Sequence, residues 1–216
     1  DCSTGKNAKD RIIEAIKILN GALAIKLSVQ STDENVMKNM RRDNISSDQM
    51  LALVPAIRES NLPSVTEIIV GLPGDSFTTN IKTIKDMMRV DVDQYLVYTL
   101  MLLHGSELAT PEEREKWGFN TKFRILPRSF AELKSGKKIM EVEEVVVSSN
   151  SLSFDEYVKI RLLSFSIFVT NQISYKPIIK FLRQNNVDIF DLFNRPLEDN
   201  NLPNNIQNVF DEFKKS

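Results

Sequence analysis

One stretch of sequence decides the fold class: Val65-Thr66-Glu67-Ile68-Ile69-Val70-Gly71-Leu72. Its apolar centre, Ile68-Ile69-Val70, is typical of a strand that is buried in a sheet covered on both faces. Two more apolar stretches, residues 22–30 and 95–103, have the same character, and helical patterns separate the three. Parallel strands require such helical crossovers. The sequence therefore predicts an α/β fold with parallel strands, either as part of a barrel or as part of a doubly wound sheet.

The predicted helices begin at recognisable side-chain signals. Apolar residues at helical spacing predict one helix over residues 9–19 and another over residues 77–89. In a capping box, a Ser or Thr before the helix and a Glu or Gln three residues later bind each other's backbone. Such boxes are expected at Ser31 with Glu34, Ser46 with Gln49 and Ser153 with Glu156, and Pro111 is expected at the start of a further helix.

The pattern changes after residue 110, and we expect two parts. Short extended segments are predicted over residues 123–126 and 139–148, further helices over 177–182 and 203–213, and a loop over 198–205. We place the boundary so that residues 1–128 form the α/β part and residues 129–216 form a smaller, mainly helical part.

Composition excludes several classes of function. The chain has 216 residues, with 28 Lys and Arg against 29 Asp and Glu, so its net charge of -1 offers no overall basic field for nucleic acid. A single Cys excludes an internal disulfide framework and a four-cysteine metal site built by this chain alone. With a single His, histidine-rich metal sites and Ser-His-Asp chemistry lose most of their ligands.

Nothing in the sequence indicates a membrane or secreted protein. Apolar stretches such as Leu96–Leu103 are too short to span a bilayer, and the beginning of the chain does not have the pattern of a signal peptide. We therefore expect a cytoplasmic protein. The chain begins with Asp1 instead of Met, so we expect a fragment of a longer protein at least as much as a processed start.

Candidate functional residues lie where the predicted strands end, because parallel α/β proteins bind ligands at the carboxyl ends of their strands. Gln30 offers both an acceptor and donors for ribose hydroxyls, although an amide there can equally cap the next helix. Arg41 and Arg42 either interact with the end of that helix or hold a ligand carboxylate bidentately. The segment Gly71–Asp75 allows a tight turn and a helix cap, and His104 is expected to be a solvated loop residue.

Three segments together resemble the radical S-adenosylmethionine (radical SAM) enzymes. Ser28–Arg42 resembles the fourth strand and helix of these enzymes, Thr66–Asp75 their fifth strand, and Tyr98–Leu108 their sixth. The three occur in the same order and at similar spacing. With the additional segments Ser3–Asn7 and Lys17–Leu23, the first 128 or so residues are most similar to the cobalamin (B12)-binding radical SAM group.

The resemblance implies a six-stranded partial (βα) barrel of the TIM type, of which this chain supplies the C-terminal half. In the family, such a barrel binds a [4Fe–4S] cluster and S-adenosylmethionine, and one-electron reduction releases a 5′-deoxyadenosyl radical. The resemblance implies the following cofactor contacts. Gln30 would contact the ribose, with Ser28 beside it, and Arg42 would pair with the methionyl carboxylate, or Arg41 if the register shifts by one. Ile69 would pack on the adenine, and the backbone of Leu102 and Leu103 would complete that pocket. No catalytic side chain is assigned.

The chain also departs from the family pattern. The family's cluster motif has three cysteines spaced C-x3-C-x2-C, whereas this chain has only Cys2, so we expect no metal ligand in it. The family's glycine-rich second strand and the cobalamin-binding domain do not occur in these residues. Asp75 stands where the family usually has Glu, and His104 where relatives often have Pro. Residues 22–30 would pair with an upstream strand, which we expect to be missing from this chain.

The leading hypothesis is the C-terminal part of a radical SAM enzyme, a methyltransferase or a related radical catalyst. Its cofactors would be S-adenosylmethionine and a [4Fe–4S] cluster, with cobalamin a further candidate. Its expected partners are an electron donor and a small-molecule substrate that this sequence does not identify, and neither nucleic acid nor a membrane is expected. A second hypothesis is a degenerate, non-catalytic barrel that serves as an interaction scaffold. A third is an ordinary α/β enzyme with coincidental matches.

Overall fold

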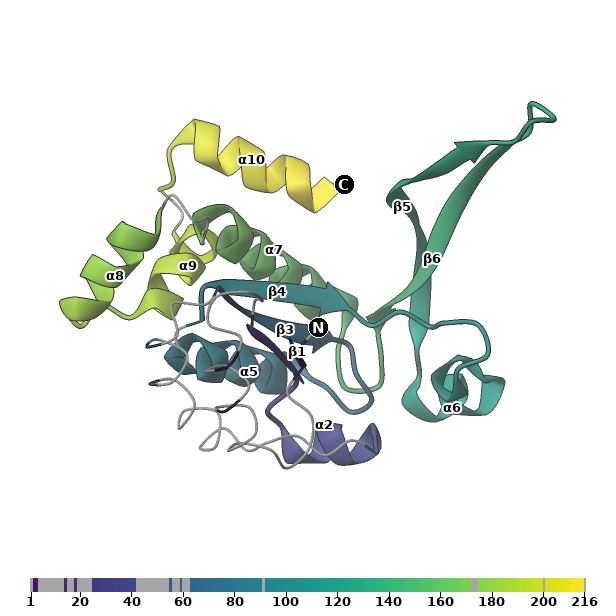
Figure 1. Cartoon of the computed structure of the whole chain (residues 1–216), viewed down its shortest axis with the longest axis horizontal. Coiled ribbons are helices and arrows are strands. Elements are labelled where there is room, and N and C mark those ends of the chain that lie inside the picture. The colour runs from purple at the N-terminus through teal and green to yellow at the C-terminus, as the bar shows by residue number, and fades with distance from the viewer. Residues whose placement is uncertain are drawn as a thin grey trace.

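The computed structural model describes residues 2–3, 14, 18, 25–41, 55, 59, 63–90, 92–171, 175–199 and 201–215. Within these residues the protein has a parallel sheet, an antiparallel hairpin and a group of C-terminal helices (Figure 1). The predicted α/β class with parallel strands is confirmed. The helices predicted over residues 9–19 and after Ser46 fall almost entirely outside the described residues. In the described part of the chain, no helix has the length and apolar character needed to cross a membrane.

The parallel sheet contains three full strands and one short strand, in the order β1-β2-β3-β4. Their bounds are Cys2–Ser3 for β1, Ile25–Gln30 for β2, Ser64–Val70 for β3 and Gln94–Thr99 for β4. The register aligns Leu27 with Thr66 and Thr66 with Tyr95, and an irregularity between Leu27 and Gln30 shifts the end of β2. Among the described residues the sheet is open and does not close into a barrel.

Strand β1 corrects one expectation. Cys2 and Ser3 pair in parallel with Ile25 and Lys26, so an upstream strand that we expected to be missing is in part present in this chain. It covers only the beginning of that edge of β2. In the described part of the chain, no residue pairs with Leu27–Gln30 on this side. An uncovered strand edge of this kind can accept a further strand.

Three helices cover one face of the sheet, because they contribute to one core cluster with β2, β3 and β4: α5 (Phe77–Val90), α7 (Phe154–Thr170) and α9 (Ile189–Glu198). Alternate residues of the strands point to this face, because successive side chains of a strand alternate between its two sides. These strand residues form the main core together with apolar side chains of the helices. The strands contribute Leu27, Val29, Ile68 and Tyr95, and the helices contribute Ile84, Met87, Leu163, Ile167, Phe190 and Phe193. Burial of this apolar area is the main stabilising contribution to the fold.

An antiparallel hairpin follows β4 and extends away from the sheet and the helices (Figure 1). Its strands are β5 (Asn120–Glu132) and β6 (Lys138–Ser148), and their pairing aligns Phe123 with Glu144. The two extended segments that the sequence predicts separately are thus halves of one hairpin. The boundary placed between residues 128 and 129 falls inside β5, and the helices of the second part begin only after β6.

Helix α2 (Glu34–Asn39) lies where a helix is predicted, but it begins two residues later than a cap at Ser31 implies and has a different cap. The carboxylate of Asp33 accepts hydrogen bonds from the backbone N–H groups of Asn35 and Val36, each at 3.0 Å. Ser31, the predicted cap, instead accepts a bond from the backbone N–H of Asp33 at 3.2 Å. Asp33 takes the position because it directly precedes the first helical residue, where a side-chain oxygen reaches the open N–H groups.

Most other predicted helix starts are confirmed. Pro111 begins α6 (Pro111–Trp117) after the short 3-10 turn Glu107–Ala109, and Ser153 and Glu156 form the predicted capping box of α7. Helix α8 (Lys176–Gln184) contains the segment 177–182 predicted to be helical, and α10 (Asn204–Lys215) begins one residue after the predicted start at Pro203. Helix α9 is not predicted by the sequence pattern, because Pro196 interrupts a short apolar stretch that the core of the protein nevertheless holds in helical form.

A bidentate ion pair attaches α6 to the hairpin. The two terminal guanidinium nitrogens of Arg114 donate to the two carboxylate oxygens of Glu144, each at 2.6 Å. Arg114 Nε donates to the carbonyl of Ala109, and the hydroxyl of Thr121 donates to Glu144. The Arg114 side chain is 31% exposed and that of Glu144 is 14% exposed. These hydrogen bonds, chiefly those from Arg114, lower the pKa of Glu144 to about 2.

We predict that Arg114→Lys destabilises the protein by about 1–2 kcal/mol, because a lysine keeps the charge but cannot bind both oxygens. Urea unfolding measures the loss. The matched control is Arg41→Lys, since Arg41 pairs with Glu107 where the side chains are 75% and 58% exposed. That change is expected to alter stability by less than about 0.5 kcal/mol. Equal losses in the two variants would contradict the prediction.

Candidate functional site

The face of the sheet opposite the helices carries two of the predicted cofactor residues. Because strand residues alternate, this face receives Ser28 from β2, Glu67 and Ile69 from β3, and Tyr98 from β4. The first three are half-buried and Tyr98 is exposed, in contrast to the fully buried residues of the helix-covered face. Gln30, which is also half-buried, follows the irregularity in β2 and lies opposite Ile68, so strand alternation places Ser28 and Ile69 on this face but does not place Gln30.

Gln30 has an unusual conformation at the end of β2. Its backbone φ is +62°, in the left-handed region that residues other than glycine seldom adopt. Its side-chain oxygen Oε1 is buried and has no hydrogen-bond partner among the described residues. An unpaired buried acceptor costs about 1–3 kcal/mol. Such strain and such unpaired groups are found preferentially where a protein binds a ligand, so Gln30 marks the candidate site.

A polar cluster that the sequence analysis missed lies beside Gln30. Ser28 Oγ donates to Glu67 Oε2 at 2.8 Å, and Lys26 Nζ pairs with Glu67 Oε1 at 2.9 Å. The hydrogen bond to Glu67 is the main reason that the pKa of Lys26 is raised, and Tyr98 contributes to a smaller extent. The signal was present in the sequence: an acidic residue stands in the middle of the apolar stretch 65–72, and Lys26 lies two residues before Ser28.

Ile69 and Leu102 come together in a second apolar cluster at the carboxyl end of the strands. Leu102 is buried there with Leu72 and Val146, and Ile69 packs against them with its side chain half-buried. The backbone N–H of Leu102 donates to the carbonyl of Glu144, so β6 holds this segment in place. Leu103, which follows, is exposed. The predicted adenine-binding residues thus share one edge of the sheet.

The loop after β3 is held by the buried carboxylate of Asp75. This carboxylate accepts hydrogen bonds from the backbone N–H of Gly71 at 3.1 Å, the hydroxyl of Thr79 at 2.7 Å and the side-chain amide of Asn80 at 3.2 Å. Gly71 and Gly74 have φ values of +85° and +80°, which explains the need for glycine at the two positions. Burial raises the pKa of Asp75 to about 6, and the hydrogen bonds oppose part of that shift.

The remaining predicted residues are placed as follows. Arg42 lies outside the described residues. Arg41, its alternative, is exposed at the surface and pairs with Glu107 at 3.0 Å. His104 is exposed, as expected of a solvated loop residue. In the described part of the chain, no group of three or more His, Cys, Asp or Glu side chains is placed to hold a metal ion.

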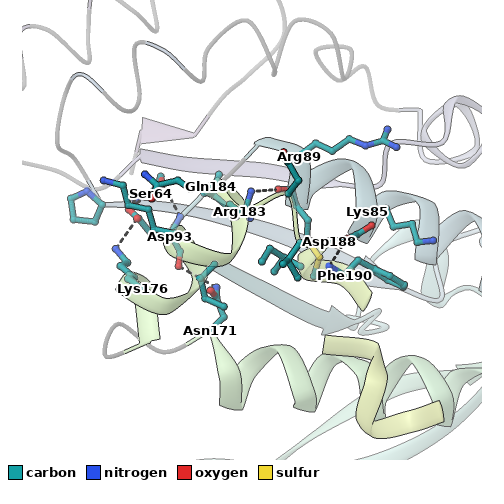
Figure 2. A pocket seen from close by; sticks show the side chains of 18 residues that line it. Ser64, Lys85, Arg89, Asp93, Asn171, Lys176, Arg183, Gln184, Asp188 and Phe190 are labelled. Atoms are coloured by element: carbon teal, nitrogen blue, oxygen red, sulfur yellow. Dashed lines mark hydrogen bonds and ion pairs between the residues drawn. The ribbon is translucent and has the colours of Figure 1, made fainter. Parts of the chain in front are cut away.

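A groove of about 1110 Å³ lies at the other edge of the sheet, where β3 and β4 begin (Figure 2). Ser64 and Asp93 line it together with residues of α5, α8 and α9. Asp93 accepts a bond from the backbone N–H of Ser64 at 2.8 Å and pairs with Lys176 at 2.7 Å. These groups attach α8 to the sheet. We take the Gln30 edge as the candidate site, because parallel α/β proteins bind ligands at the carboxyl ends of the strands.

We predict that Asp75→Asn changes the pH dependence of stability. The folded-state pKa of about 6 lies above the ordinary value of 3.8, so this carboxyl stabilises the protein fully below pH about 4 and less as the pH rises through about 6. Asparagine does not titrate. Relative to the unchanged protein, the variant should therefore gain stability between pH about 4 and about 7, by at most about 3 kcal/mol.

Urea unfolding at a series of pH values tests this prediction. The control is Asp191→Asn, which changes an exposed carboxyl in the first turn of α9. A stability difference between the Asp75 variant and the unchanged protein that stays constant with pH would contradict the prediction.

Comparisons with known proteins address the predicted resemblance. No family model matches the chain. The chain is 29% identical over 205 residues to the cobalamin-dependent radical SAM methyltransferase TokK of Streptomyces tokunonensis, covering 90% of this chain and 29% of that protein. It is 29% identical over 159 residues to the 2-(S-pantetheinyl)-carbapenam-3-carboxylate methyltransferase of Streptantibioticus cattleyicolor, covering 71% of this chain and 23% of that protein.

The chain spans less than a third of the length of the curated relatives it matches. The similarity extends past the candidate site into the C-terminal helices, since it covers most of the chain. The predicted resemblance is confirmed at this level: over most of its length, the chain is distantly similar to cobalamin-dependent radical SAM methyltransferases.

Proposed function

We propose that the chain is part of a radical SAM methyltransferase and supplies half of a pocket for S-adenosylmethionine. The pocket lies at the carboxyl edge of the parallel sheet, where Gln30, Ile69 and Leu102 are placed. The distant similarity to radical SAM methyltransferases supports the class of reaction. The open sheet supports the role of a partial barrel, because the uncovered edge of β2 can accept the strands that precede it in the family.

The unpaired oxygen of Gln30 is the observation that carries the proposal. A buried acceptor with no described partner fits a ligand that brings a hydroxyl donor, and the ribose of S-adenosylmethionine has two. The ligand would then satisfy a group that the described residues leave without a hydrogen bond. The bond from Ser28 to Glu67 orients a polar side chain two residues before Gln30.

Other residues of this chain would bind the rest of the cofactor. Ile69 would contact the adenine ring, with the backbone around Leu102 and Leu103 completing this side of the pocket. Arg42 would hold the methionyl carboxylate. When bound and reduced by one electron, S-adenosylmethionine supplies a 5′-deoxyadenosyl radical. The residues named here bind and orient the cofactor.

The [4Fe–4S] cluster does not fit this chain. Its motif requires three cysteines, and the sequence contains one. We therefore assign the cluster, the electron donor and any bound cobalamin to protein other than these 216 residues, and we expect the chain alone to be inactive. The second candidate function is a non-catalytic scaffold. A chain with one cysteine that also failed to bind S-adenosylmethionine would fit this function.

We predict that Gln30→Leu weakens binding of S-adenosylmethionine about tenfold, because leucine has similar volume and cannot accept the ribose hydrogen bond. Isothermal titration calorimetry measures the affinity of the full-length protein, in which the missing strands of the pocket are supplied. The control variant is Gln184→Leu, which makes the same change at an exposed position of α8. No binding by the unchanged full-length protein would contradict the proposal and favour the scaffold. Equal affinities of the two variants would remove Gln30 from the pocket.

We predict that Arg42→Ala weakens binding of S-adenosylmethionine at least tenfold, through loss of a charge-assisted bond to the methionyl carboxylate. The same variant should bind 5′-methylthioadenosine as the unchanged chain does, since that nucleoside has no carboxylate. Calorimetry with the two ligands separates this loss from general damage. Arg41→Ala is the matched control, because the Arg41 side chain pairs with Glu107 at the surface. A loss in Arg41→Ala alone would assign the carboxylate to Arg41.

A further inference from the structure

One face of the β5–β6 hairpin is apolar and exposed. The register pairs Ile125 with Val142 and Phe130 with Met140 across the hairpin, and Phe123 lies two residues before Ile125 on the same side. These five side chains are 56–78% exposed. They form a continuous apolar strip, which we call the hairpin face. Exposed apolar patches larger than a few hundred Å² mark interaction surfaces in soluble proteins.

The described charges of the hairpin face carry no excess of one sign. Glu144, which lies opposite Phe123, is bound by both terminal nitrogens of Arg114 and by the hydroxyl of Thr121. Beyond the strip, the exposed residues Glu132 and Lys138 lie opposite each other on the same side of the hairpin. Because one acidic and one basic side chain stand there, the face can oppose a second copy of itself with unlike charges facing, which suits a two-fold symmetric interface.

The attachment of the hairpin to the rest of the fold is limited to its base. Leu102 donates to the carbonyl of Glu144, and Val146 donates to the carbonyl of Leu100. Val146 is buried in the cluster that also contains Leu102, whereas the strip farther along β6 is exposed. Two-stranded hairpins are only marginally stable without packing on one face. The outer half of the hairpin therefore gains stability from a protein surface that covers it.

The area of the hairpin face matches half of a dimer interface. Its five side chains expose roughly 600 Å² per copy, so two copies would bury roughly 1,200 Å², the lower end of stable protein–protein interfaces. We propose that the hairpin face binds the hairpin face of a second copy of this chain, forming a two-fold symmetric dimer through Phe123, Phe130 and their neighbours.

Sedimentation equilibrium of the 216-residue chain tests the proposal. Over concentrations from about 1 µM to about 100 µM, the unchanged chain should show a reversible equilibrium between monomer and dimer. Replacing Phe123 and Phe130 together with Ser should raise the dimer dissociation constant at least about tenfold. Met140→Glu is a second, independent variant, because it places like charges in the interface while its side chain is solvated in the monomer.

The matched control is Phe181→Ser, which removes an exposed phenylalanine from α8, away from the hairpin face. It should leave the dissociation constant unchanged, and circular dichroism should show the same fold in all variants. A chain that stays monomeric over the whole concentration range overturns the proposal and leaves the face to a different protein surface. A dimer that forms equally well with Met140→Glu also overturns it.

Discussion

The parallel sheet buries only one of its two faces deeply, and the position of the candidate site follows from this asymmetry. Helices α5, α7 and α9 contribute side chains to a single cluster with Leu27 and Ile68, so every second strand residue is committed to the core. The residues between them, such as Ser28 and Glu67, are left for the opposite face. A polar site can exist there only because the apolar core on the other side holds the strands in register.

The charges on the site face are balanced within the face itself. Lys26 and Glu67 pair with each other, and Ser28 donates to the same carboxylate. Gln30 is the exception, because its oxygen is buried without a partner among the described residues while its backbone is in a strained conformation. An unsatisfied acceptor of this kind is the group that a ligand with a hydroxyl donor would satisfy in the proposed site.

The sequence was most informative where local chemistry decides the structure. The Ser153–Glu156 capping box and the start of α6 at Pro111 depend on neighbouring residues only, and the apolar stretch around Ile68 identified a buried strand. Features that depend on distant contacts were missed. The hairpin was predicted as two separate segments because its strands lie far from the core and alternate weakly, and α9 forms because Phe193 is buried under the sheet.

In the candidate site, too, residues marked by local sequence were predicted, and contacts between strands were missed. Gln30 was singled out because it ends an apolar stretch, whereas Ile69 was implied by the family resemblance; both lie near the carboxyl ends of their strands. The Lys26–Glu67 pair depends on the register of two strands, which a single sequence does not specify. The capping role of Asp33 shows the limit of spacing rules, since a nearer oxygen displaced the predicted one.

The main core joins residues from nearly opposite ends of the chain, since Leu27 lies in the same cluster as Phe193. Contacts that are so distant in sequence close late, because a long loop must lose entropy before they form. The hairpin needs only its own short turn and can form earlier. During synthesis on the ribosome, β5 and β6 would therefore emerge and pair while α9 is still untranslated. The nascent chain would then expose apolar side chains of the hairpin before its core exists, a stage at which aggregation competes with folding.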